Sequence, residues 1–312
     1  MKSNVSPQLP SVAAPEGRSA GLGRPCARPR SYRRRAWNQR ALNALTWAIV
    51  ALTLSPVAFM VYASLSDYND VVTGNLVNAT FTPHWSNYRE MWVDVDFLSF
   101  LRNSLVICGF TTLISTVLAS MAAYALARFR FRGNHPFSVA VSTTQVIPGM
   151  LFFLPLYMLY IQIDDAGLPM MNTYHGMIFL YSAMFTPASI WIMRGFFVSI
   201  PRDLEDAAVI DGCSRFGAFV RVVLPISMPG IIATASFVFL LAWDEVFFAW
   251  VLTSSPDVQT VPVGLRLYMG QHATRYDLMM AAAVVSVIPV LLTFFASQRW
   301  FIKGLAAGAV KG

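Results

Sequence analysis

The residues whose types and spacing could do chemistry fall into two groups. The first is the acidic pair Asp244 and Glu245, which follows Trp243 in the otherwise apolar stretch LLAWDEVFFAW. The second is the charged 199–228 loop, SIPRDLEDAAVIDGCSRFGAFVRVVLPISM, between two long apolar segments. Carboxylates in an apolar segment are costly, which indicates a polar pathway or a packing partner. A long loop with helical patterning indicates a binding surface.

The 199–228 loop is patterned as two helices outside the membrane. The first helix begins near Pro201, a bend follows at Gly212, and the second helix ends at Pro225. One face of the first helix holds Leu204, Ala207, Ala208 and Asp211. One face of the second helix holds Phe216, Phe219, Val220, Val223 and Leu224. The alternative is a connector that packs only on its own bundle.

The composition indicates a protein whose solvent is lipid. Of 312 residues, 56% are hydrophobic and 12% are charged, about half the charge of an average soluble domain. The apolar residues form uncharged runs long enough to cross a bilayer. Six spans are expected, and each takes up one such run, at about 41–65, 103–127, 136–163, 172–194, 229–253 and 278–298. The sequence therefore predicts an all-α six-helix membrane bundle over residues 41–312.

The net charge of +7 is concentrated at the N-terminus. Residues 1–40 hold nine basic residues and Glu16, a charge of +8, which leaves −1 for the remainder. This segment has few large apolar side chains and is expected to be a disordered basic tail. An arginine cluster before a span is a topology and lipid signal, and no nucleic-acid recognition motif accompanies it. The first apolar run is longer than a signal-peptide core, which favours a retained helix over a cleaved signal.

Basic residues also indicate the orientation. Of the 23 lysines and arginines, 19 lie in the tail, the expected inner loops and the helix ends. The remaining four are expected outside: Arg89, Arg102, Arg266 and Arg275. This asymmetry predicts cytoplasmic termini and places the 199–228 loop in the cytoplasm.

Motifs of enzymes and metal sites are not found. The sequence has no GxxxxGK[ST] phosphate loop, no HExxH and no GxSxG. Its four histidines and three cysteines are scattered, which predicts neither a metal site nor a disulfide framework. No catalytic residues are expected. Trp243 and its aromatic neighbours could stack on a sugar, or belong to the interfacial aromatic belt.

The 199–228 loop resembles the EAA signature of binding-protein-dependent ABC import permeases. The match runs from Asp206, Ala207 and Ala208 through Gly212 to Leu224 and Pro225, with the family's spacing. Asp206 stands where the family has Glu, which leaves open whether Glu205 or Asp206 makes the contact with the ATPase. Val222 stands where Ile is common.

The resemblance extends over roughly residues 80–312, with the permease core at about 99–300. PHWSNYREMW, RNSL and FIKGLAAGAVKG are similar to the carbohydrate branch, the maltose-type second permease. That branch frequently has WNE where this chain has Trp243, Asp244 and Glu245. The change from Asn to Asp adds a potential charge to the expected substrate pathway.

The resemblance implies a coupling helix in this loop that docks on an ATP-binding subunit. Glu205, Asp206, Ala207, Ala208, Gly212, Leu224 and Pro225 would form the coupling site, with Phe216, Phe219 and Val220 anchoring the second helix. It also implies a second homologous permease, a dimer of ATPase subunits that hold ATP and Mg, and an extracytoplasmic solute-binding protein. The chain itself is expected to hold no cofactor.

We therefore expect a permease subunit in a bacterial inner or plasma membrane that carries a sugar or oligosaccharide. One alternative is an ion- or proton-coupled secondary transporter with Asp244 and Glu245 as coupling carboxylates. Another is an importer permease for a non-sugar solute such as a polyol or glycerol phosphate.

Overall fold

The structure is built from helices. This computed structural model describes residues 30–74, 82–270 and 274–309, which fall into two compact units, Met1–Ser55 and Pro56–Gly312. Strand pairing in the described residues amounts to an isolated antiparallel bridge between Met269 and Thr274. The all-α membrane fold class expected from the sequence is confirmed.

The elements follow one another along the chain with short connections. They are α1 (Arg30–Ser64), α2 (Tyr68–Thr73), α3 (Ser86–Asp94), α4 (Phe97–Arg128), α5 (Asn134–Val146), η2 (Gly149–Phe152), α6 (Phe153–Asp165), α7 (Tyr174–Ser199), α8 (Asp203–Ile210), α9 (Arg215–Ala218), η3 (Phe219–Val223), α10 (Leu224–Ile226), α11 (Met228–Asp244), α12 (Phe247–Leu252), α13 (Val261–Leu265), η4 (Arg266–Tyr268) and α14 (Tyr276–Ala309).

Four helices are long and apolar enough to cross a bilayer, namely Gln39–Ser64, Phe97–Arg128, Tyr174–Ser199 and Tyr276–Trp300. Two bent pairs reach the same length together, Asn134–Val146 with Gly149–Asp165 and Arg215–Ile226 with Met228–Asp244. The described residues thus contain four candidate spans, or six if each bent pair counts as one.

The helix α1 begins at Arg30, inside the 1–40 segment that the sequence predicts to be disordered. Arginine and glutamine are good helix formers, and a helix already formed by the following apolar run extends backwards through them at little cost. Residues 1–29 of the expected tail lie outside the described residues.

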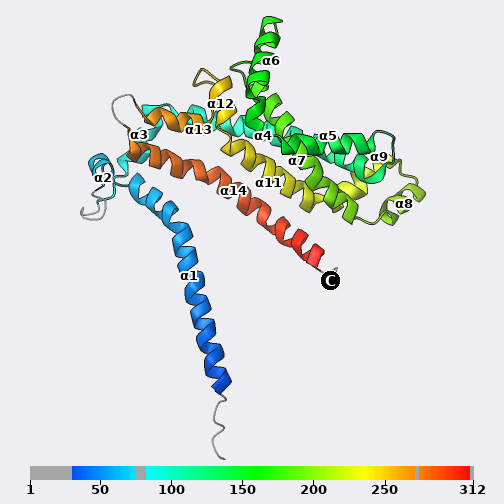
Figure 1. Cartoon of the computed structure of the whole chain (residues 1–312), viewed down its shortest axis with the longest axis horizontal. Coiled ribbons are helices and arrows are strands. Elements are labelled where there is room, and N and C mark those ends of the chain that lie inside the picture. Colours follow the sequence, from blue (N-terminus) through cyan, green and yellow to red (C-terminus); the bar gives the residue numbers. More distant parts are fainter. Residues whose placement is uncertain (1–29, 75–81, 271–273, 310–312) are drawn as a thin grey trace, which may run out of the picture. The chain divides into compact units, whose positions relative to one another are not determined.

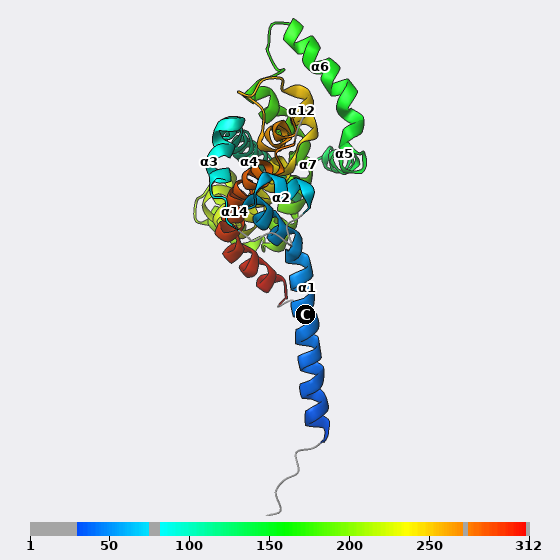
Figure 2. The same cartoon turned by 90° about the vertical axis from the view of Figure 1, so that its left-hand side faces the viewer.

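The range 136–163, expected as one span, holds two helices. The axes of α5 and α6 differ by 98°, and Figure 2 shows α6 leaving α5 at this angle. The break falls at Ile147, which is extended (φ −80°, ψ 123°) before Pro148. The ring of a proline disfavours the helical conformation of the residue before it, so α5 ends there.

The range 229–253 is also interrupted. The helix α11 ends at Asp244, and Glu245 leaves the helical conformation (φ −73°, ψ 118°) before α12 begins. The Glu245 side chain accepts hydrogen bonds from the amides of Phe248 and Ala249, at 2.9 and 3.1 Å. A carboxylate that binds the first amides of a helix favours a new start at that point.

The helix α4 is central to the packing of the Pro56–Gly312 unit. It runs against both α7 and α11, and α11 also packs on α14 (Figure 1). One apolar cluster surrounds the Phe97 end of α4 and includes Phe100, Tyr181 and Trp243. A second cluster surrounds its Arg128 end and brings together Tyr124, Phe197, Phe219 and Val223. The 199–228 loop therefore shares a core with the end of α4.

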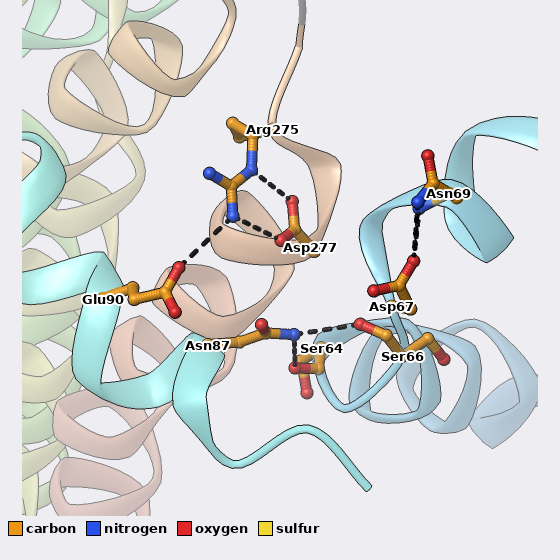
Figure 3. A network of polar contacts seen from close by, with 8 residues as sticks. All are labelled: Ser64, Ser66, Asp67, Asn69, Asn87, Glu90, Arg275 and Asp277. Carbon is orange, nitrogen blue, oxygen red and sulfur yellow. Dashed lines mark hydrogen bonds and ion pairs between the residues drawn. The ribbon is translucent and has the colours of Figure 1, made fainter. Parts of the chain in front are cut away.

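Polar contacts join short helices to the bundle near the Phe97 end of α4. Asn87 of α3 donates to the carbonyl oxygens of Ser64 and Ser66, both at 3.0 Å. Arg275 pairs with Asp277 at 2.8 Å and with Glu90 at 3.5 Å, as Figure 3 shows. The hydrogen bond to Asp277 raises the pKa of the Arg275 guanidinium, which keeps this network charged.

A substitution at Gly264 tests the packing of α13 on α4. A Cβ atom at Gly264 would lie 2.5 Å from Cγ of Phe100, which is fully buried. We expect Gly264→Ala to destabilise the protein by about 1–3 kcal/mol through overpacking and to lower its melting temperature in detergent. The control is Gly109→Ala in α4, where a Cβ atom meets nothing within 4 Å. Equal melting temperatures for the two variants would contradict the packing described.

Candidate functional site

The first half of the 199–228 loop is a short helix followed by a left-handed turn. The helix α8 covers eight residues, Asp203–Ile210, and its first turn holds Asp203, Glu205 and Asp206. Acidic residues there interact favourably with the helix dipole. Gly212 has φ +92°, a conformation that L side chains rarely adopt, and the Cys213 amide donates back to Ala208 O at 3.0 Å. The predicted helix and glycine bend are both present.

The second half of the loop continues further than the sequence predicts. A π turn, η3, covers Phe219–Val223, and the helix passes through Pro225 to Ile226 before a 75° bend leads into α11. Proline lacks an amide hydrogen, so a continuous α-helix would lose a hydrogen bond at Pro225. The π turn shifts the pattern so that the Leu224 amide binds Phe219 O. The predicted helix end at Pro225 is therefore wrong.

The buried face of the second helix also differs from the expected one. Phe219 and Val223 are buried beside Tyr124, and the Tyr124 and Phe219 ring centroids are 4.3 Å apart. Phe216 is 71% exposed and Val220 is 43% exposed. The expected anchoring role of Phe216 and Val220 is thus not seen in this chain, because only the positions four residues apart at 219 and 223 face the core.

Glu205 is bound to the bundle. Its Oε1 forms an ion pair with Arg128 Nε at 2.5 Å, and its Oε2 accepts from the Tyr124 hydroxyl at 2.9 Å. The side chains of Arg128 and Glu205 are only 7% and 13% exposed. Arg128 also donates to Ile200 O at 2.9 Å, and Arg202 donates to Ala127 O at 3.2 Å. These contacts fasten α8 to the end of α4.

The neighbouring residues of α8 alternate between the bundle and the outside. Asp206 and Ala207 are exposed, whereas Ala208 is buried at 8%. Asp206 has no hydrogen bond or ion pair to the part of the chain that the structure describes. Of the two carboxylates left open by the sequence, Glu205 is engaged within the chain and Asp206 is available to a partner.

The exposed side of this region is partly apolar. Ile210 is 84% exposed at the end of α8, and Leu204 and Val209 are about half as exposed. Phe216 presents its ring on the following helix. Large exposed apolar side chains beside a charged group are typical of a protein–protein contact surface.

The acidic pair at the end of α11 divides in the same way. Glu245 accepts from the Tyr181 hydroxyl at 2.7 Å as well as from the α12 amides, so its oxygens are satisfied within the chain. Trp243 is buried at 7% and stacks on Phe239. Asp244 is exposed. Of the expected pathway residues, only Asp244 presents its side chain to the surroundings.

The arrangement offers a docking surface and a polar group at a helix end. Within the described ranges, no group of three or more His, Cys, Asp or Glu side chains is placed to hold a metal ion. The 199–228 loop and the acidic pair lie about one α11 length apart along the chain, so they form separate sites.

Residues 115–307 match the family model described as "Binding-protein-dependent transport system inner membrane component". The chain belongs to this family. The match covers more than half of the chain and includes both the 199–228 loop and the acidic pair. As a family member, the chain is a permease subunit of an ABC importer and a membrane protein, and the ATPase of such systems is a separate subunit.

Two relatives agree with this assignment. The chain is 33% identical over 274 residues to the trehalose/maltose transport system permease protein MalG of Thermococcus litoralis, covering 87% of this chain and 95% of that protein. It is 33% identical over 279 residues to the trehalose transport system permease protein SugB of Mycobacterium tuberculosis, covering 87% and 99%.

The fold matches a solved importer. A chain of the crystal structure of a bacterial ABC transporter involved in the import of the acidic polysaccharide alginate superposes with a TM-score of 0.71 and 21% identity. The match covers 88% of this chain and 99% of that one. It shows that the permease shares the fold of an ABC importer subunit.

Three residues of these sites escape a reading of the sequence alone. Arg128 counts there only as a topology signal, and Tyr124 and Tyr181 lie unremarked within apolar spans. No local pattern connects Arg128 with Glu205, since 77 residues separate them along the chain. The signal that could point to them is a polar side chain at the end of a span, which needs a partner when it is buried.

The ion pair makes a testable contribution to stability. Glu205→Gln leaves the Arg128 charge buried without a carboxylate, which costs about 3 kcal/mol in comparable buried pairs. We expect a clear drop in the melting temperature of the purified permease. Asp206→Asn, which changes an exposed neighbour in the same way, should leave the melting temperature unchanged. A double variant with Arg128→Gln should recover part of the loss, and no recovery would mean that the two side chains are not coupled.

The acidic pair supplies a second stability test. Glu245→Ala removes the acceptor of two α12 amides and of the Tyr181 hydroxyl, and we expect a loss of about 1–2 kcal/mol, as for other capping residues. Asp244→Ala removes an exposed carboxylate and should change stability by less than about 0.5 kcal/mol. Thermal melting in detergent measures both. Equal effects of the two substitutions would contradict the division of the pair.

Proposed function

We propose that this permease forms part of the membrane path for a carbohydrate that an extracytoplasmic binding protein delivers. ATP hydrolysis takes place on two separate ATPase subunits, which hold ATP and Mg, and a second homologous permease completes the path. The observation that carries the proposal is the construction of α8. One side of α8 is fastened to α4 by a buried ion pair, and the other side exposes Asp206, Ala207 and Ile210.

The proposed coupling site uses both sides of α8. Asp206 and Ala207 contact the ATPase subunit, with Asp206 offering a carboxylate and Ala207 allowing close approach of the backbone. Gly212 provides the turn after α8, and Leu224 and Pro225 lie where the second helix leads into the bundle. Glu205 and Ala208 face the bundle and hold α8 in place.

Movement of the ATPase subunits is transmitted through this rigid contact. When the ATPases close, they displace α8, and the Arg128–Glu205 pair passes the displacement to α4. Because α4 packs along α7 and α11, the displacement moves the bundle between inward-facing and outward-facing states. Phe219 and Val223 join the second helix of the loop to the same core, so the whole loop moves with α4.

The proposed topology has six spans with both termini in the cytoplasm. The four long helices and the two bent pairs supply the spans. Arg128 lies at the end of α4 and contacts Glu205, so this end of α4 and the 199–228 loop lie on the same side of the membrane. Arg130 and Arg132 follow directly, and such basic clusters mark the cytoplasmic side.

The carbohydrate cargo is supported by the relatives and by Asp244. Both relatives described above are named for disaccharide transport. Asp244, exposed at the end of α11, is suited to accept hydrogen bonds from sugar hydroxyls along the path. Trp243 and Glu245 support this position from the interior by stacking on Phe239 and by capping α12.

A charge placed on the docking surface tests the coupling. Ala207→Glu puts a carboxylate where the ATPase subunit must approach closely, and burying an unpaired charge costs several kcal/mol. We expect ATP-driven, binding-protein-dependent uptake of radiolabelled trehalose or maltose into proteoliposomes to fall by more than about tenfold. The ATPase subunit should also fail to copurify with the variant.

The matched control is Ala166→Glu, which places the same charge at an exposed alanine beyond the end of α6. Its uptake and subunit composition should equal those of the wild type. Normal uptake by Ala207→Glu would refute the coupling site. Uptake by the isolated chain without ATP would refute the importer mechanism in favour of a secondary transporter.

A further inference from the structure

A polar cavity lies between α5 and α7, away from the 199–228 loop surface and from the acidic pair. Its volume is about 470 Å³, and its polar lining comprises Asn134, His135, Ser138, Ser142, Thr143 and Arg194. Arg194 is five residues before the end of α7, a distance of about 7.5 Å along a helix. The cavity therefore lies close to one end of the membrane-spanning part of α7.

Arg194 has no acidic partner in this cavity. Its guanidinium carbon lies 4.9 Å from the centre of the Trp191 ring, and its Nε atom is buried without a hydrogen-bond partner. The three ion pairs found among the described residues involve Arg128 and Arg275 instead. A buried arginine nitrogen that donates to nothing is costly, which indicates a missing acceptor.

Ser138 supplies a second unpartnered donor in the same cavity. Its Oγ atom is buried and makes no hydrogen bond. The hydroxyls of Ser142 and Thr143, one turn further along α5, each donate to a backbone carbonyl four residues earlier at 2.9 Å. Ser138 is thus the α5 lining hydroxyl that remains available, and it faces the same space as Arg194.

The chemistry of the lining selects an anion. It contains an arginine, a histidine and an available hydroxyl, and none of its residues is an aspartate or a glutamate. Arg130 and Arg132 lie in the short segment directly before α5 and add positive charge nearby. A phosphate, with several acceptor oxygens, can bind an arginine and a hydroxyl at once.

We propose that this cavity binds the phosphate of an anionic phospholipid. The polar lining continues into the apolar side chains of Val139 and Val146, which are 49% and 80% exposed, and Trp191 is of the interfacial kind. A polar end and an adjoining apolar rim fit an amphiphile better than a free ion. Basic pockets between membrane helices on the cytoplasmic side are suited to anionic headgroups. This site would regulate or stabilise the permease and takes no part in the sugar path.

The test measures lipid retention directly. The assembled transporter is purified in detergent with equal amounts of phosphatidylglycerol and phosphatidylcholine, and retained lipid is counted by native mass spectrometry. We expect the wild type to retain phosphatidylglycerol preferentially. Arg194→Gln should reduce that retention by about tenfold, as expected for the loss of a charge-assisted hydrogen bond. Ser138→Ala, which keeps the charge, should give a smaller reduction and serves as the second measurement if Arg194→Gln does not assemble.

The matched control is Arg299→Gln. Arg299 also lies over a neighbouring tryptophan, Trp300, near the end of an apolar helix, but it is not part of the cavity. Its substitution should leave phosphatidylglycerol retention unchanged. The proposal is overturned by equal retention of the two lipids in the wild type, by unchanged retention in the Arg194 and Ser138 variants, or by an equal loss in the Arg299 variant.

Two further outcomes would assign the cavity to another occupant. Displacement of the retained lipid by millimolar inorganic phosphate would show a simple anion site and overturn the lipid proposal. Cross-linking of a photoreactive residue placed at Ser142 to the second permease, rather than to lipid, would show a subunit interface and overturn it as well. Retention is measured without transport, so its failure leaves the coupling assignment of α8 standing.

Discussion

The ion pair between Arg128 and Glu205 is the contact on which the functional end of this permease depends. It joins α8, a helix of eight residues that could not remain folded by itself, to α4, the helix around which the Pro56–Gly312 unit packs. Both side chains are largely buried, so the pair is sheltered from solvent screening. Tyr124 adds a hydrogen bond and also packs on Phe219, which links the charged contact to the apolar core.

A general constraint of membranes explains the other irregular features. Polar groups within an apolar environment must be satisfied inside the protein. Glu245 meets this demand by binding the first amides of α12 and the Tyr181 hydroxyl, and the cost is a break after α11. Pro225 meets it through the π turn before it, which restores pairing for the Leu224 amide. Arg194 does not meet it within the chain, and this makes its cavity a candidate binding site.

The two acidic pairs of the chain are divided by the same principle. Glu205 and Glu245 each turn inward and are fully engaged, while Asp206 and Asp244 remain exposed beside them. The engaged glutamate holds a helix in position, and the exposed aspartate is presented to the outside. In the proposed function, the first aspartate faces the ATPase subunit and the second faces the sugar path.

The sequence by itself determined the helical membrane class, the family, and the helix and glycine bend at 203–212, because hydropathy, spacing and glycine conformation are local properties. It could not determine the break at Ile147, the passage of the helix through Pro225, or which of Phe216 and Phe219 is buried. Only the tertiary structure decided these points and the partners of Glu205 and Glu245. The physical reason is that a carboxylate's role depends on which donors fold against it, and Arg128 and Tyr181 come from helices distant in the chain.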